Sequence, residues 1–217
     1  MGLKFYVLRD PITDSPEDRR GGMDVIEEES FKTGPAPLCP KCAQPVGLRS
    51  WLPPYRVEME TWGSEYGDLV RLGNNVVVSD RFVRTYQKAD LKGLSPFEPV
   101  EVIRFIHRRG KPKEPPPTFF TATVPRSQTT VDQEKSEYQR KKGAIVCPVC
   151  LQGGIVDQYK RVCIVSVTWT GEDIFFPRGG LDIVVTETFK EAFEQHSLRG
   201  SIYIPAEECG WDAYAPL

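Results

Sequence analysis

A pattern that occurs twice in the same order is the feature of this chain that most constrains its fold. Two cysteine pairs of the form Cys-Pro-X-Cys, Cys39–Cys42 and Cys147–Cys150, begin the pattern and lie 108 residues apart, from position 39 to position 147. The blocks that follow each pair keep an offset of 107 and finally 106 residues: Trp62 with Trp169, Val77–Phe82 with Val184–Phe189, Leu91–Gly93 with Leu198–Gly200, and Phe97–Pro99 with Tyr203–Pro205. This order predicts a tandem duplication of a unit of ~100 residues, the alternative being a chance recurrence of short strand and helix patterns.

Each copy predicts the same succession of three strands and one helix. The strands are short apolar runs, several of them rich in β-branched residues: 55–61, 68–71 and 76–78 in the first copy, and 162–169, 173–176 and 183–185 in the second. Ser79 and Thr186 then stand where an N-cap hydroxyl is expected. Helices are therefore predicted over about 80–91 and 187–198, with Gly93 and Gly200 at their ends. Further strands are expected at 4–9, 100–106 and 118–124.

These elements predict an α+β fold of two tandem-duplicated units, each a small antiparallel sheet with one helix. The first unit is expected over residues 1–107 and the second over residues 143–217. Residues 108–142 between them begin with a basic, proline-rich stretch and continue with a strongly charged one. This composition is typical of a solvated linker, or of a solvated helix in its second part.

The two cysteine pairs predict a metal site. A Cys-Pro-X-Cys turn is a zinc knuckle that supplies two thiolates, and tetrahedral zinc needs four ligands. We therefore expect Cys39, Cys42, Cys147 and Cys150 to hold one structural Zn²⁺ near a pseudo-twofold axis between the units. Such an ion would join the two units as a cross-link does. Of the other two cysteines, Cys163 lies in an apolar run and is expected to be a small core residue, and Cys209 is expected to be a core or edge thiol.

Two alternative functions remain open at this stage. A Cys-X-X-Cys pair can be a dithiol of the thioredoxin type, although turn residues follow both pairs here. The chain can also be a zinc-containing nucleic-acid-binding or regulatory module that uses the basic cluster 104–113, but a net charge of −2 argues against this. An enzyme is not expected, because the sequence holds two histidines, His107 and His196, and no nucleophile elbow or phosphate-binding glycine loop.

The composition favours a protein of a reducing, cytoplasmic compartment. The sequence has no apolar run of the ~18 residues needed to cross a bilayer, so no membrane association is expected. The first residues, 1–6, lack the apolar core of a secretion signal.

The doubled Cys-Pro-X-Cys pairs, each followed by a Val-Val-Ser/Thr-Asp/Glu-X-Phe helix start and a Leu-Lys/Arg-Gly end, resemble a known family. It is the myxobacterial paralogous family with a doubled Cys-X-X-Cys-Gly motif, which includes the Sit-type immunity proteins. The likeness runs from about residue 5 to residue 205. The sequence departs from the family at the glycine after each pair, where Ala43 and Leu151 stand.

The resemblance implies a cytoplasmic immunity protein that binds and neutralises a toxin delivered by kin cells, with no small-molecule substrate. It assigns no catalytic residue. An inhibitor often presents a charge opposite to that of its target. If the toxin is basic, the acidic group Asp24, Glu27, Glu28 and Glu29 is the expected binding face.

Overall fold

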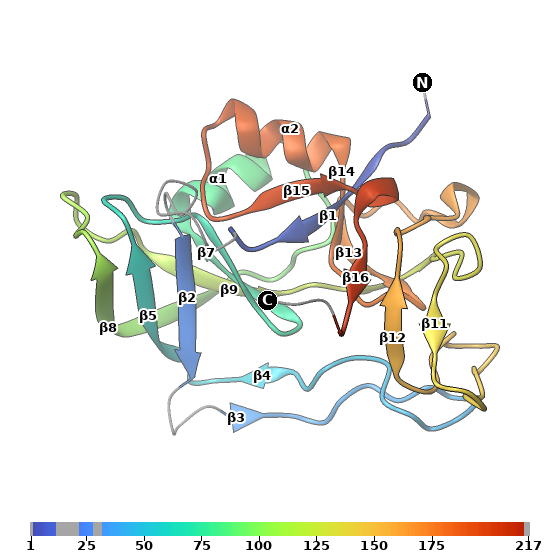
Figure 1. Ribbon diagram of the computed structural model, residues 1–217. Coiled ribbons are helices and arrows are strands. Elements are labelled where there is room, and N and C mark those ends of the chain that lie inside the picture. Colours follow the sequence, from blue (N-terminus) through green and yellow to red (C-terminus); the bar gives the residue numbers. More distant parts are fainter. Residues whose placement is uncertain (1, 12–21, 28–31, 215–217) are drawn as a thin grey trace.

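The computed structural model describes residues 2–11, 22–27 and 32–214, and it has an α+β fold that is mostly sheet with two α-helices (Figure 1). The largest sheet has six strands in the order β2 (Gly22–Glu27), β5 (Arg56–Trp62), β8 (Glu98–Arg109), β9 (Phe119–Thr123), β7 (Asn75–Ser79) and β6 (Leu69–Leu72). A second sheet has five strands in the order β10 (Arg126–Thr130), β13 (Ile174–Arg178), β14 (Val184–Thr186), β1 (Phe5–Arg9) and β15 (Ile202–Pro205).

The six-stranded sheet encloses its own core. Strand β5 alternates buried and half-buried residues along its whole length, because one of its faces looks into this core. It pairs antiparallel with β2 and parallel with β8. Val57 and Met59 of β5 are fully buried and pack with Val77 of β7 and Phe119 of β9. The sheet curves, so that its outer strands β2 and β6 approach each other.

The five-stranded sheet combines the two ends of the chain. Strand β1 lies between β14 and β15 and pairs antiparallel with both. Its residues Val7 and Leu8 are fully buried and face opposite sides of the sheet, where they join two different cores. The N-terminal strand is therefore an inner strand of a sheet whose other strands all come from residues 126–205.

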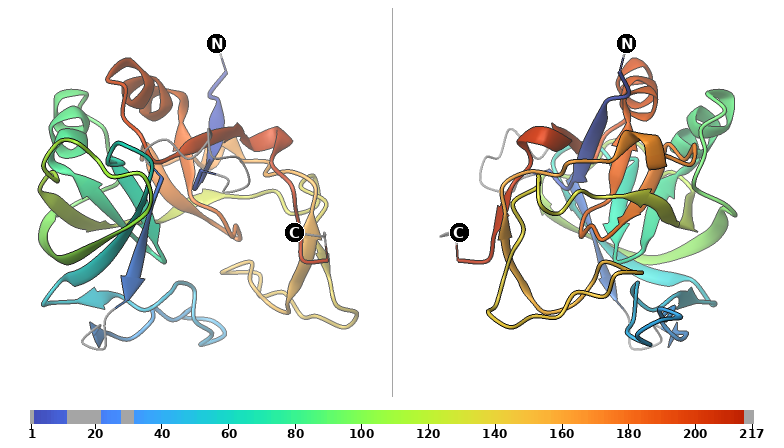
Figure 2. Two further views of the ribbon diagram at one scale, coloured as in Figure 1. Left: turned by 60° about the vertical axis from the view of Figure 1, so that its left-hand side comes forward. Right: turned by 90° about the vertical axis from the view of Figure 1, so that its right-hand side faces the viewer.

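The helices α1 (Asp80–Lys88) and α2 (Glu187–Gln195) lie side by side on one side of the sheets (Figure 1, Figure 2). The expected N-caps are confirmed, because Ser79 and Thr186 accept hydrogen bonds from the backbone N–H groups of Phe82 and Phe189. The rings of Phe82 and Phe189 are 6.0 Å apart, and both side chains are almost completely buried. The largest core thus lies between the two helices and the strands beneath them.

Two small sheets flank the cysteine segments at the bottom of Figure 1. One pairs β3 (Lys32–Thr33) with β4 (Trp51–Leu52), and the other has the order β11 (Gln139–Arg140), β12 (Val156–Tyr159) and β16 (Trp211–Asp212). They frame the loops 34–50 and 141–155, which extend away from the main sheets. Two 3₁₀ turns, η1 (Ser166–Thr168) and η2 (Ala206–Glu208), complete the described elements.

The strand predicted over 162–169 is wrong. Only Ile164 forms an isolated bridge, to Val131, and the chain then turns through η1. Val167 is 94% exposed, so the alternation of β-branched residues does not mark a buried face here. A run with strand propensity becomes a strand only where neighbouring strands offer continuous backbone partners.

Several other expectations need correction. The range 108–142, expected to be a linker, contains β9, β10 and β11, and no α-helix forms in it. Both helices end three residues early, at Lys88 and Gln195, because Asp90 and Ser197 adopt left-handed backbone angles, at φ 51° and 50°. Gly93 also has a positive φ, but it lies beyond the end of the helix.

Candidate metal centre

Each cysteine pair forms a tight turn whose backbone hydrogen bonds are the same in both. The N–H of Cys39 donates to the carbonyl of Gln44 over 2.9 Å, and the N–H of Ala43 donates back to the carbonyl of Cys39 over 2.9 Å. In the second turn, the N–H of Cys147 donates to the carbonyl of Gln152, and the N–H of Leu151 donates back to the carbonyl of Cys147, both over 2.8 Å. These bonds close a loop around each pair and point both of its sulfurs to one side.

The residue after each pair has a left-handed backbone. Ala43 has φ 55° and Leu151 has φ 59°. Glycine adopts such angles without steric cost, whereas residues with a Cβ do not. Each turn therefore requires a positive φ at the residue after the pair, and this chain meets the requirement with alanine and leucine.

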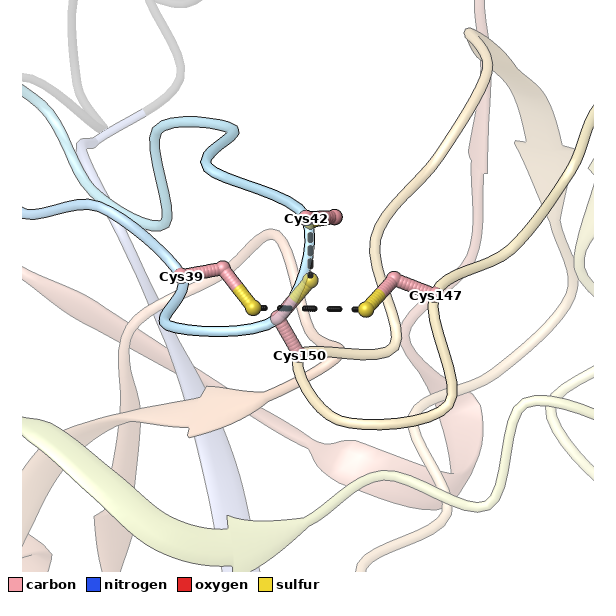
Figure 3. Close-up of side chains that lie close together, drawn as sticks. All are labelled: Cys39, Cys42, Cys147 and Cys150. Carbon is pink, nitrogen blue, oxygen red and sulfur yellow. Dashed lines mark hydrogen bonds between the residues drawn. The ribbon is translucent and has the colours of Figure 1, made fainter.

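The two turns bring the four sulfurs together at the meeting point of loops 34–50 and 141–155 (Figure 3). The Cys39 and Cys147 sulfurs are 3.9 Å apart, the Cys42 and Cys150 sulfurs are 3.8 Å apart, and all four lie within 4.8 Å of one another. Zn–S bonds of ~2.3 Å in a tetrahedron hold sulfurs about 3.8 Å apart. The four cysteines are free thiols, and together they could bind one metal ion.

The first cysteine of each pair has a lowered pKa, which favours its thiolate form. Backbone N–H groups of Cys150 and Val149 that point at the sulfur lower the pKa of Cys147 to about 6. The backbone N–H of Cys42 likewise lowers the pKa of Cys39. Burial acts in the opposite direction on the second cysteine and raises the pKa of Cys150 to about 12. A bound metal ion would supply the positive charge that the buried thiolates need.

A pocket of about 340 Å³ opens beside the four cysteines. Cys39 and Cys150 line it from the two turns, and Arg126 and Arg178 line it from β10 and β13. The Nε atom of each arginine is buried and has no hydrogen-bond acceptor among the described residues. The sequence analysis missed both arginines, because nothing local in the sequence marks them as neighbours of the cysteines.

A second pair of residues missed by the sequence analysis joins the two halves of the chain. The backbone N–H of Asp68 donates to the carbonyl of Arg199 over 2.7 Å, and the N–H of Asp173 donates to the carbonyl of Lys92 over 2.7 Å. The Asp68 carboxylate accepts from the backbone N–H of Arg199 at 2.8 Å, and that of Asp173 accepts from the N–H of Lys92 at 2.9 Å.

The same two aspartates also hold the starts of the helices. Asp68 accepts from the hydroxyl of Ser79 at 2.6 Å, and Asp173 accepts from the hydroxyl of Thr186 at 2.7 Å. The signal that could have found them is their equivalent place before the second strand of each copy.

The acidic group expected to bind a partner is only partly described. Asp24 lies in β2 with an exposed side chain, and Glu27 ends that strand. Glu28 and Glu29 lie outside the described residues. The expected binding face formed by these four residues therefore stays a prediction.

The basic cluster 104–113 carries less free charge than the sequence indicates. Arg104 forms an ion pair with Glu58, and Arg108 forms one with Glu60. His107 is part of strand β8, and its Nδ1 lies 2.7 Å from the Thr61 hydroxyl. This neutralisation weakens the cluster as a site for a nucleic-acid backbone.

The remaining candidate residues lie outside the metal centre. Cys209 is buried, with its sulfur 3.5 Å from an Nη of Arg9, and Cys163 is half-buried. His196 follows the last residue of α2 and is exposed. Its Nδ1 lies 3.0 Å from the carbonyl of Ala192.

The described part of the chain contains no helix with the length and apolar character that a membrane crossing requires. No protein-family model matches the chain, and no curated protein sequence matches it either.

Proposed function

We propose that Cys39, Cys42, Cys147 and Cys150 hold one structural Zn²⁺. The observation that carries this proposal is the group of four free thiols, from two turns 108 residues apart, with sulfurs within 4.8 Å of one another. Four thiolates are a soft ligand set typical of structural zinc, and they leave no coordination position for water or substrate. The ion would supply charge neutralisation and would tie the loops 34–50 and 141–155 to each other.

The chain is, in this proposal, a tandem duplication with an approximate twofold axis that passes between the turns and between the helices. Reciprocal bonds support it: Asp68 of the first half bonds to Arg199 of the second, and Asp173 of the second bonds to Lys92 of the first. Contacts in which i meets j and j meets i are typical of a twofold arrangement. The core between the helices is also lined by residues at equivalent positions: Phe82 and Phe189, Tyr86 and Phe193, Leu91 and Leu198.

Strand pairing supports an exchange of leading strands between the two copies. Strand β9 pairs with β7 so that Phe119 faces Ser79, and β1 pairs with β14 so that Phe5 faces Thr186. Since Ser79 and Thr186 are equivalent N-caps, β1 and β9 occupy equivalent places. Each copy would begin with such a strand, and each strand lies in the sheet of the other copy. The units are then mutually dependent and would not fold as separate domains.

We propose that the protein is a non-enzymatic binding protein, and specifically a cytoplasmic immunity protein that neutralises a toxin delivered by kin cells. A closed metal centre supports the first part, because it offers a rigid scaffold and no reactive position. The family resemblance of the doubled cysteine motif supports the second part. Complete coordination would also set the four thiols apart from those of a dithiol oxidoreductase, which need access to a substrate disulfide.

Two experiments test the proposed function. Elemental analysis of the purified chain, with thiol counting before and after chelation, should give one zinc per chain and four thiols that become reactive when zinc is removed. Co-expression of this chain with a candidate toxin should protect sensitive cells, whereas the same toxin without this chain should kill them. An absence of metal with freely reactive thiols contradicts the zinc site, and an absence of protection contradicts the immunity function.

A further inference from the structure

The two cysteine segments have a charge composition unlike that of the rest of the chain. No Asp or Glu occurs between residues 30 and 57 or between residues 138 and 156, although acidic and basic residues nearly balance over the whole sequence. The segments carry several cations that form no ion pair with any described residue: Lys32, Lys41 and Arg49 in the first, and Arg140, Lys141 and Lys142 in the second. Within the part of the chain that the structure describes, no carboxylate pairs with these six cations.

Arginines elsewhere in the structure behave differently. Most of them form ion pairs with a carboxylate: Arg9, Arg56, Arg71, Arg81, Arg84, Arg104, Arg108, Arg161 and Arg199. Arg126 and Arg178, in the pocket beside the cysteines, have no such partner among the described residues. Together with the six cations of the two segments they give eight positive charges without an ion-pair partner among the described residues. Zinc with four thiolates would carry a net charge of minus two, so this part of the surface would stay positively charged.

The same segments also expose apolar side chains. Of the large hydrophobic residues that are exposed in the described structure, six lie here: Leu38, Leu48, Leu52, Ile145, Val149 and Ile155. Ile145 is 88% exposed and Ile155 is 64% exposed, and neither is needed by a core of this chain. Exposed apolar residues that gather on one part of a surface indicate a site of interaction.

We propose that this surface is the docking site for a protein partner whose own surface is acidic and partly apolar. We call it the knuckle face and define it by residues 32–52 and 138–156 together with Arg126 and Arg178. The two segments lie next to each other in every view, below the main sheets (Figure 1, Figure 2). The inference rests on the proposed binding function, and it moves the expected contact surface away from the acidic group that includes Asp24.

Arginine combined with apolar side chains is typical of the centre of a protein interface. A nucleic-acid partner fits less well, because single strands are bound by stacking on exposed aromatic rings. The one tryptophan of the segments, Trp51, is buried, and the exposed groups are aliphatic. The pocket lined by Arg126 and Arg178 offers a place for an inserted carboxylate, since guanidinium groups bind carboxylates with paired hydrogen bonds.

The test uses a fluorescent peptide built from Glu-Glu-Leu repeats as the acidic, partly apolar probe, with the zinc-loaded full chain. We expect binding that weakens as salt rises, and amide chemical-shift changes confined to the knuckle face. The variant K41E/R49E/K142E should bind at least ~10-fold more weakly. A matched control, K88E/K111E/K113E, makes the same change in net charge on other exposed lysines and should bind within about twofold of the unaltered chain.

Four outcomes would overturn the proposal: no binding of the acidic peptide, shifts outside the knuckle face, equal loss in both variants, or tighter binding of a single-stranded or duplex oligonucleotide at the same salt concentration. Zinc content and thiol counts show whether each variant is folded, and the shift mapping on the unaltered chain does not depend on any variant. Toxin protection separates the two proposals. If K41E/R49E/K142E protects cells fully, the knuckle face is wrong while the immunity function stands. If the unaltered chain gives no protection, the immunity function fails by itself.

Discussion

The segments 68–93 and 173–200 share an antiparallel strand pair, a capped helix and reciprocal bonds to the other half, whereas the segments before them, 55–62 and 162–169, differ in structure. Both of the earlier segments alternate β-branched residues, yet the first is strand β5 and the second contains only a bridge and a 3₁₀ turn. The difference lies in their neighbours. Strand β5 has a partner on each side, β2 and the long β8. In the second half the strand that follows the helix is β15, which has only four residues and pairs with β1, so it offers the segment 162–169 no partner. Similar sequence patterns therefore give the same structure only where the neighbouring strands are also equivalent.

The largest expected effect concerns the group of four cysteines, to which each half of the chain contributes two. If the four cysteines hold the proposed zinc, C39S and C147S should each remove it and destabilise the chain severely, because structural zinc contributes ~10 kcal/mol or more to folding. Thermal unfolding and zinc content measure both effects. The matched control C163S changes a cysteine outside the cluster and should keep zinc and most of the stability. A shared site predicts that C39S and C147S are equally damaging, and one of them retaining a full zinc ion would contradict it.

The next effect tests the equivalence of the two helices in the core. F82A and F189A each remove an almost fully buried ring from the contact between α1 and α2. Each should lower the free energy of unfolding by about 3–5 kcal/mol. Urea denaturation measures both, with V167A as a control that should change the free energy of unfolding little, since Val167 is exposed. A large difference between the two phenylalanine variants would count against an equivalent role for the helices.

A smaller effect separates the two aspartates that connect the halves. D68A leaves the hydroxyl of Ser79, a backbone N–H and the guanidinium of Arg81 without their acceptor, and Asp68 is 3% exposed. D173A leaves only the hydroxyl of Thr186 and a backbone N–H, at a half-buried site. Each lost acceptor of a buried donor costs ~1–3 kcal/mol. Urea denaturation should therefore show a greater loss for D68A than for D173A, and the opposite order would contradict this account of the contacts.

These comparisons show which parts of the fold a single sequence reveals. The N-caps Ser79 and Thr186 and the cysteine turns are encoded by residues close in sequence, so they could be predicted. The meeting of the four thiols could be predicted too, because a tetrahedral ion needs two knuckles. The position of β1 between β14 and β15 depends on pairing partners about 180 residues away, with Phe5 opposite Thr186, which local patterns do not encode. The arginine pocket depends on strands β10 and β13 meeting the cysteine turns, and it is likewise invisible in the sequence.

The smallest effect concerns the two positions of positive φ in the cysteine turns. A43G should raise the free energy of unfolding by up to ~1 kcal/mol, because glycine relieves the left-handed strain at an exposed site. L151G relieves the same strain but removes the side chain that fills the space beside the Cα of Gly179, so packing is lost there. We expect no gain for L151G. Urea denaturation of the zinc-loaded chains checks both, and a gain for L151G as large as that for A43G would mean that the leucine contributes no packing to the second turn.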